Sequence, residues 1–289
     1  SSAEKSMRAL AQFAMSGRRQ AILAAVLLGF LPVVNFLSPP VVALVALRHG
    51  KSEALIVLAW ALLPALGWAI LGEMIPLLLM LGIAVLALVL RSTGSWEATL
   101  IASIGVGFGA QLGLSLQPEF LALMEEQVTQ LMEQLANSPE LQGQVIFAAP
   151  EQLHQWLLMV FGTMVVFFSI TLLMLARSWQ AGLFNPGGFR EEFHQLRLGW
   201  KASAVMFLMF ILADYGPPVL QQLALFFLMP LLVAGVALVH GLVGRRKLPT
   251  AVLVIFYSAL ISPVMFQLLA LAALADSWYD FRSRVRPRE

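Results

Sequence analysis

The sequence predicts an all-α, polytopic transmembrane helical bundle of about nine or ten short to medium membrane segments. Of its 289 residues, 60% are apolar and only 12% are charged, about half the charged fraction of a soluble domain. Apolar stretches long enough to cross a bilayer alternate with short clusters of Lys and Arg. These observations exclude an ordinary soluble protein, and we treat residues 1–289 as a single integral membrane domain.

The positive charges predict the orientation of the segments. Short cytoplasmic loops collect Lys and Arg, so we place every basic cluster and the N-terminus on the cytoplasmic side of a bacterial-type inner membrane. Each apolar stretch between clusters then crosses the membrane an even number of times. Residues 1–19 precede the first stretch as an amphipathic cytoplasmic helix.

Residues 20–116 contain the first hairpins. Asn35, Pro39 and Pro40 interrupt the first apolar stretch, because proline removes a backbone donor and breaks a helix. This stretch therefore predicts two short helices rather than one long tilted helix. The predicted helices are 20–34, 38–48, 53–72, 74–90 and 97–116.

Residues 117–153 form an acidic connector that we expect outside the cytoplasm, because no Lys or Arg occurs between Ser92 and Ala176. Apolar residues recur at helical spacing from Pro118 onward, which predicts an amphipathic outer helix over 118–136. A membrane helix over 154–176 follows the connector.

The remainder consists of a cytoplasmic loop, 177–201, C-terminal hairpins, 202–278, and a basic tail, 279–289. The loop contains a turn followed by a short interfacial helix. The hairpins are broken at residues 214–218 and 262–263. Two interpretations of 249–278 remain open: one tilted helix or a hairpin.

Two segments of the chain resemble each other. Phe36 to Gly50 matches Phe227 to Gly241 at ten of fifteen positions. Either a parallel repeat, as found in transporters, or a chance match of apolar residues explains this. In both copies a histidine, His49 or His240, precedes glycine, and we expect each to end its helix, where imidazole suits the negative terminus.

Three polar residues at helix breaks, Asn35, Asp214 and Tyr215, are the candidate ligand-binding residues. A carboxylate near a membrane segment is costly unless it is paired or hydrated. Asp214 therefore indicates either a ligand or proton site at a broken helix or a carboxylate at the outer water interface. Asn35 at the matching break has the same two interpretations.

Other residues point to packing. Gly105, Gly109 and Gly113 recur every four residues, a pattern that lets helices approach closely. We expect them to pack within the bundle; a dimer contact or room for a ligand are the alternatives. Asp276 and Arg282 are expected to form a structural ion pair.

The sequence lacks the patterns of most other functional classes. It has no cysteine, its histidines lack metal-ligand spacing, and we find no nucleophile, phosphate-loop or dinucleotide motif. The net charge of +2 and the dispersed basic residues argue against nucleic acid. We therefore expect no catalytic residue, metal or cofactor, and no enzymatic activity.

Three short segments carry a family resemblance: residues 32–50, residues 188–198 and residues 274–282. They resemble the YybS-like family of predicted membrane proteins of unknown function. That family is distantly similar to the substrate-binding S components of energy-coupling-factor transporters, so the resemblance implies a small-molecule binding fold. The chain departs from a simple S component in its extra segments, acidic connector and basic tail, and no family site residue carries over.

The leading functional interpretation is a small-molecule or lipid binding or transport protein. The alternative is a non-enzymatic scaffold or assembly factor with a protein partner at the cytoplasmic loop 178–199 or the outer helix 118–136. The lipid bilayer is a partner in either case. The ligand, the oligomeric state and the engagement of an ATPase module are left open.

Overall fold

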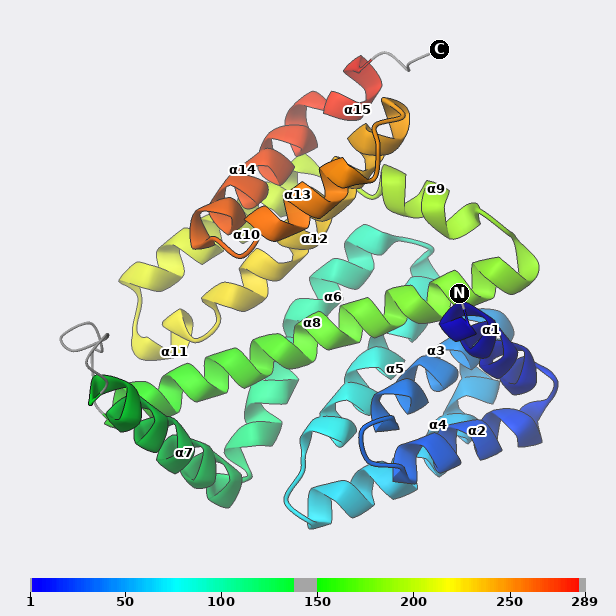
Figure 1. The fold of residues 1–289 in the computed structure, drawn as a ribbon, viewed down its shortest axis with the longest axis horizontal. Coiled ribbons are helices and arrows are strands. Elements are labelled where there is room, and N and C mark those ends of the chain that lie inside the picture. The colour runs from blue at the N-terminus through cyan, green and yellow to red at the C-terminus, as the bar shows by residue number, and fades with distance from the viewer. Residues whose placement is uncertain (1, 138–149, 286–289) are drawn as a thin grey trace.

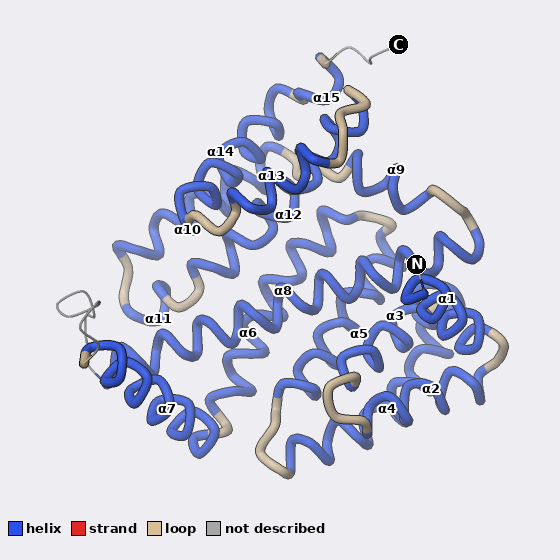
Figure 2. The backbone as a smooth tube through the Cα atoms, viewed as in Figure 1, coloured by secondary structure: helices blue, strands red, loops and turns tan. Residues whose placement is uncertain are grey.

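The computed structural model describes residues 2–137 and 150–285, and every regular element within them is a helix (Figures 1 and 2). The all-α prediction is therefore confirmed. The elements are α1 Ser2–Met15, α2 Arg18–Phe30, the 3-10 helix η1 Asn35–Leu37, α3 Ser38–His49, α4 Lys51–Ile70, α5 Ile75–Thr93, α6 Trp96–Ser115, α7 Pro118–Ala136, α8 Pro150–Phe184, α9 Gly188–Gln195, α10 Trp200–Tyr215, α11 Pro218–Gln221, α12 Ala224–Arg245, α13 Ala251–Ala259, α14 Pro263–Tyr279 and α15 Phe281–Arg284.

Among the described residues, five helices are long and apolar enough to cross a membrane: α4, α5, α6, α8 and α12. Two bent pairs also pass when each is taken together, α9 with α10 at 65° and α13 with α14 at 114°. The protein thus has five candidate spans, or up to seven if each bent pair is one span. The sequence-based number is larger because it counts each arm of a broken hairpin separately.

The bend between α13 and α14 answers the question left open for residues 249–278. They form two helices rather than one tilted helix. The break lies at Ser262, just before Pro263 starts α14, where proline is tolerated in the first turn of a helix.

The first broken hairpin has the predicted form, with α2 and α3 joined through η1. Gly29 lies in the last turn of α2, where backbone carbonyls lack partners within the helix. The indole N–H of Trp68 on α4 donates to the Gly29 carbonyl at 2.8 Å, and the buried Ser38 hydroxyl donates to the Ala25 carbonyl at 2.7 Å. These bonds allow the break to lie within apolar surroundings, where water is not at hand.

The helices form two regions on either side of α8. The N-terminal region, residues 2–93, packs α2, α4 and α5 around α3, whose residues Ser38 to Leu47 are all buried. The C-terminal region, residues 188–285, packs α9, α10 and α14 around α12. Figure 1 shows the long helix α8 (light green) running between the regions, and it contacts both α3 and α12.

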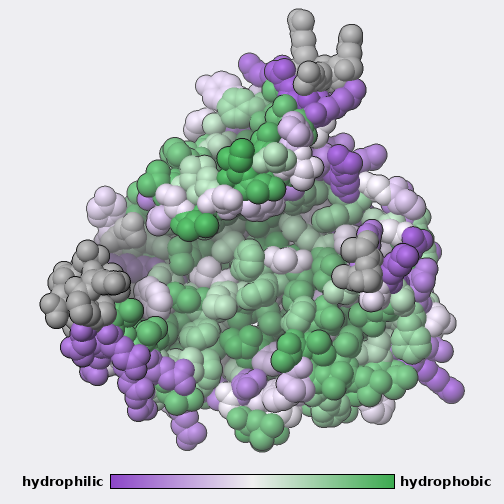
Figure 3. Space-filling model, in the orientation of Figure 1, coloured by the Kyte–Doolittle hydropathy of each residue, from purple (hydrophilic) through white to green (hydrophobic). Residues whose placement is uncertain are grey.

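The surface is divided by polarity. Figure 3 shows hydrophobic residues across the middle of one face and hydrophilic residues at two opposite margins. One margin is α7, and the other carries α1, α9 and α15. The second margin carries basic residues, and two of them form ion pairs: Arg18 with Glu53 at 2.5 Å and Arg197 with Asp280 at 3.4 Å. We call this margin the basic end.

The outer helix predicted over 118–136 is α7, and it is docked on α8. Leu121 is buried, and the ring of Phe120 meets that of Phe161 on α8 edge-on at 5.3 Å. A carboxylate oxygen of Glu125 lies 2.6 Å from Nδ1 of His154, also on α8. One face of α7 therefore packs against the bundle, and the opposite face is exposed.

Candidate functional site

The structure does not bring the predicted ligand residues into one site. Asn35 begins η1, which packs against α2, α3 and α5. Tyr215 ends α10 in the C-terminal region and is 86% exposed. Figure 1 shows these two helix breaks well apart. Asp214 is in α10, but its side chain lies outside the described part of the chain, so its role stays a prediction.

Only one of the three glycines in the stripe on α6 packs closely against another helix. A Cβ built on Gly113 would lie 2.6 Å from Leu78, whereas nothing lies within 4 Å of one on Gly105 or Gly109. Those two glycines line an apolar groove of about 290 Å³ between α5 and α6. The expectation of packing within the bundle is therefore wrong for Gly105 and Gly109.

The rotation of α6 explains this correction. The helix buries a different face, consisting of Thr99, Leu100, Ser103, Gly107, Ala110 and Leu114. Its close glycine contact is at Gly107, where a Cβ would lie 2.7 Å from the ring of Phe226 on α12. Burial of this face turns Gly105 and Gly109 outward, and their dimer or ligand alternatives remain predictions.

Asp276 and Arg282 form the expected pair, with Oδ2 and Nη2 3.4 Å apart. Both side chains are buried. Nη1 of Arg282 donates to the carbonyls of His194 at 3.1 Å and Leu196 at 2.7 Å. Burial lowers the pKa of Arg282, while Asp276 and Asp280 act to raise it. The pair ties α14 and α15 to the segment that follows α9.

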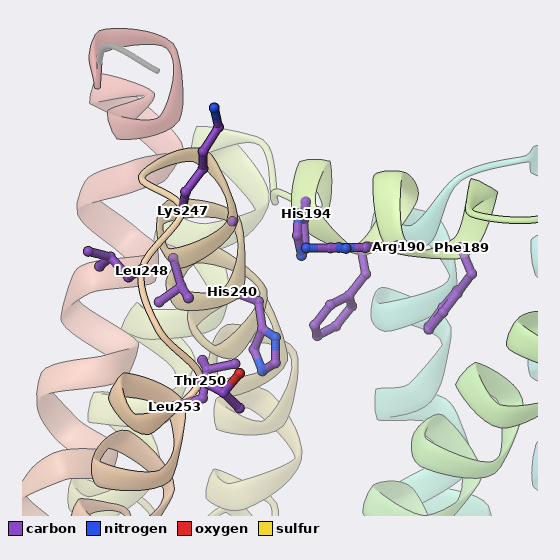
Figure 4. A pocket seen from close by; sticks show the side chains of 11 residues that line it. Phe189, Arg190, His194, His240, Lys247, Leu248, Thr250 and Leu253 are labelled. Carbon is purple, nitrogen blue, oxygen red and sulfur yellow. The ribbon is translucent and has the colours of Figure 1, made fainter. Parts of the chain in front are cut away.

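The main candidate site is a pocket of about 650 Å³ where α9, α12 and α13 meet (Figure 4). We call it the α9–α12 pocket. Its lining residues are Phe189, Arg190, Phe193, His194, His240, Val243, Gly244, Lys247, Leu248, Thr250 and Leu253.

One wall of the pocket is aromatic. Phe193 on α9 meets the imidazole of His240 on α12 edge-on, with ring centroids 5.4 Å apart. Nε2 of His240 lies 2.8 Å from the hydroxyl of Tyr257 on α13. The imidazole of His194 packs against Gly244, where a Cβ would lie 2.6 Å from the ring. The glycine therefore lets α9 and α12 approach at this point.

The pocket is positively charged. Its lining includes Arg190 and Lys247 and no carboxylate. Glu192 on α9 turns instead toward Arg177 on α8, with which it forms an ion pair. Figure 4 shows Lys247 extending away from His194 and His240, toward the outside of the pocket. The site thus combines an apolar, aromatic interior with unopposed cationic groups.

This arrangement suits an anionic group attached to an apolar body. Arginine and lysine bind anions, whereas aromatic and aliphatic walls accept hydrocarbon. No group of three or more His, Cys, Asp or Glu side chains that could hold a metal occurs within residues 2–137 and 150–285.

Sequence reasoning placed His240 at a helix end, which is wrong because α12 continues to Arg245. It also treated Phe189, Arg190 and Phe193 as parts of an interfacial helix. The i, i+4 spacing of Phe189 and Phe193 gave a signal that one face of this helix packs against something. Nothing local identified α12 and α13 as its partners.

No family model, curated protein or solved structure matches this chain. The resemblance to the YybS-like family therefore has no support from these comparisons. The fold and the candidate spans define the class: the chain is a multi-pass helical membrane protein.

Proposed function

We propose that this multi-pass membrane protein binds an anionic amphiphile, either lipidic or a small molecule, in the α9–α12 pocket. It acts as a binding or transport protein and has no enzymatic activity of its own. The observation that carries this proposal is the combination of Arg190 and Lys247, without a lining carboxylate, with walls of Phe193 and Leu253. Such a pocket offers an anion counter-charges and shields an apolar body from water.

The positive-inside rule supports a cytoplasmic position for the pocket. Helix α12 ends at Arg245, and Arg246 and Lys247 follow it; short cytoplasmic loops concentrate such residues. With the basic end inside, the N-terminus is cytoplasmic and α7 faces the outside of a bacterial-type inner membrane. The pocket then opens at the cytoplasmic head-group level, where an amphiphile from either the bilayer or the cytoplasm reaches it.

Native mass spectrometry of the gently solubilised protein tests the proposal. Thr250→Trp fills the pocket from an exposed lining position, and Ser258→Trp adds the same side chain at an exposed position on α13 outside the lining. We expect a discrete bound mass on the wild type and on Ser258→Trp, and its loss from Thr250→Trp. Bare wild-type protein, or equal retention by both variants, would contradict the proposal.

Asp214→Asn belongs in the same experiment because it tests the separate prediction at the α10 break. Loss of bound mass from Asp214→Asn with retention by Thr250→Trp would move the ligand site to that break. Retention by Asp214→Asn with loss from Thr250→Trp would support the α9–α12 pocket.

A scaffold or assembly role is the second candidate, favoured by the outer face of α7. Leu123 and Leu131 are each about half exposed there. Deleting α7 would not test this role cleanly, because the helix also covers α8 through Leu121. The test is a pair of point variants, Leu123→Gln and Leu131→Gln, which should abolish a stable complex with a partner and leave thermal stability unchanged.

A further inference from the structure

We propose that the ligand of the α9–α12 pocket is a lipid with a phosphate monoester head group, which Arg190 and Lys247 bind at the mouth of the pocket while its chain lies along α13. This inference rests on the proposed function and names its ligand class. It follows from the number of basic side chains in the lining, from their position and from the exposure of α13.

The charges favour a phosphate monoester over other anions. Arg190 and Lys247 are basic side chains, and neither forms an ion pair with any residue in the described parts of the chain. A phosphate monoester carries between one and two negative charges and three acceptor oxygens near neutral pH. It can therefore match both cations, whereas a carboxylate or a phosphodiester carries one charge.

The geometry of the donors also suits phosphate. The planar guanidinium of Arg190 presents a fork of N–H donors that fits phosphate oxygens, and the ammonium of Lys247 adds a mobile point charge. Nε2 of His240 is engaged with Tyr257. Its other ring nitrogen, Nδ1, forms no hydrogen bond within the described residues and can contact a head group.

The depth of the charges fits a lipid. Lys247 lies two residues beyond the end of α12 at Arg245, in the turn that leads to α13 and on the side of the basic end. Its side chain extends away from the aromatic wall (Figure 4), as expected of a lysine that reaches the head-group level. Lys247 thus lies toward the mouth, whereas Thr250 and Leu253 lie near His240 at the other end of the pocket (Figure 4).

The chain of the lipid has a path along α13. This helix buries none of its residues, and Val254 and Ile255 are more than half exposed. Leu253 of the same helix lines the pocket. The chain turns by 114° between α13 and α14, and the exposed apolar residues of α13 are available to hydrocarbon. A water-soluble phosphate compound would not use this surface.

The test measures lipid binding to the full chain by native mass spectrometry in mildly alkaline buffer. The probes are dioleoyl phosphatidic acid, which is a monoester, dioleoyl phosphatidylglycerol, dioleoyl phosphatidylcholine and oleate. We expect phosphatidic acid to bind about tenfold more tightly than the others, corresponding to one additional charge-assisted contact. Arg190→Gln combined with Lys247→Gln should remove this preference.

The matched control is Arg245→Gln combined with Arg246→Gln, which removes the same charge from exposed neighbours outside the lining. The preference should survive in this control. Equal loss in both double variants would overturn the inference, because it would indicate general surface charge. Equal binding of phosphatidic acid and phosphatidylglycerol would also overturn it.

Two further outcomes separate this inference from the proposed function. Displacement of phosphatidic acid by inorganic phosphate at equal concentration would show that the acyl chains contribute nothing to binding. This result would overturn the lipid assignment but would leave an anion-binding pocket. Binding of oleate but of no phospholipid, blocked by Thr250→Trp, would overturn the phosphate assignment and support the proposed function. Absence of any bound amphiphile would overturn both.

Discussion

Helices α3 and α12 have closely similar sequences but different surroundings. In α3, ten of twelve residues are buried between α2, α4, α5 and α8. In α12, eleven of twenty-two residues are buried, and its last turns line the α9–α12 pocket. A matching apolar sequence can therefore form either a fully enclosed helix or one wall of a pocket, according to what packs around it.

The two copies differ most where the shared sequence ends. Gly50 has a φ of +85° and closes α3, whereas Gly241 is buried within α12. The residues that follow explain the difference. Lys51 follows Gly50 and begins a new helix, whereas the apolar residues Leu242 and Val243 follow Gly241, and Val243 is buried. The apolar residues extend α12 past His240, and this extension provides the wall against which α9 closes.

The largest expected effect on stability comes from the ion pair between Asp276 and Arg282. Among the described residues, no ion pair involves α3. Arg282→Ala leaves the buried Asp276 without its cation and the carbonyls of His194 and Leu196 without a donor. We expect the free energy of unfolding to fall by about 3–5 kcal/mol, measured by chemical denaturation in detergent. Limited proteolysis should cut first in the C-terminal region.

Arg284→Ala is the control, because Arg284 is exposed on the same short helix. It should change the free energy of unfolding by no more than about 0.5 kcal/mol. Equal destabilisation by the two variants would mean that α15 contributes through its helical structure and not through the buried pair.

The next effect tests the enclosure of α3. Leu44 is fully buried, and the matching position in α12 is Gly235, where a Cβ would lie 2.8 Å from the carbonyl oxygen of Leu269. Leu44→Ala should cost about 2–5 kcal/mol through a cavity. Gly235→Ala should cost about 1–3 kcal/mol through overpacking against α14. Thermal unfolding of both variants in detergent shows which one loses more stability. A larger loss of stability in Gly235→Ala than in Leu44→Ala would contradict the expectation that α3 is the more enclosed helix.

The matched glycines at the ends of the repeats give a smaller effect. A Cβ on Gly241 would lie 2.7 Å from the His194 carbonyl, so Gly241→Ala must push α9 away and should cost about 1–3 kcal/mol. Gly50→Ala meets no atom within 4 Å, but Gly50 lies at φ +85° and ψ −170°, a region almost restricted to glycine, so backbone strain alone should cost about 1–3 kcal/mol. Chemical denaturation checks both values.

The two glycine variants should also differ in binding. Only Gly241→Ala should weaken retention of an amphiphile, because it moves His194. Equal loss of bound mass from Gly50→Ala would show that the ligand does not occupy the α9–α12 pocket.

Much of the fold follows from local sequence. Prolines and polar breaks predicted the division of residues 20–48 into two helices, and α2 and α3 begin and end near the expected residues. The outer helix 118–136 also matches α7. These features depend on neighbouring residues, since proline is favoured in the first turn of a helix, as at Pro39 and Pro40 in α3, and apolar spacing defines the buried face.

The candidate site could not be predicted in the same way. The α9–α12 pocket joins residues 189–194 to residues 240–253, and their meeting depends on tertiary packing. The packing prediction for the glycine stripe was wrong for a related reason. Periodicity shows that the glycines share one face of α6, but it does not show whether that face points into the bundle. The sequence therefore predicted ligand-binding residues at helix breaks, whereas the structure forms its cationic pocket elsewhere.

The smallest effect on stability concerns the hydrogen bond that distinguishes His240 from His49. Tyr257→Phe removes the hydroxyl 2.8 Å from Nε2 of His240 and should cost no more than about 1 kcal/mol, because both side chains are partly accessible. The same variant frees the imidazole to rotate, so it should weaken phosphatidic acid binding several-fold. His49→Ala, at the exposed end of α3, should change neither the melting temperature nor binding. A variant Tyr257→Phe with full binding would show that the hydrogen bond fastens α13 to α12 without orienting His240 toward the ligand.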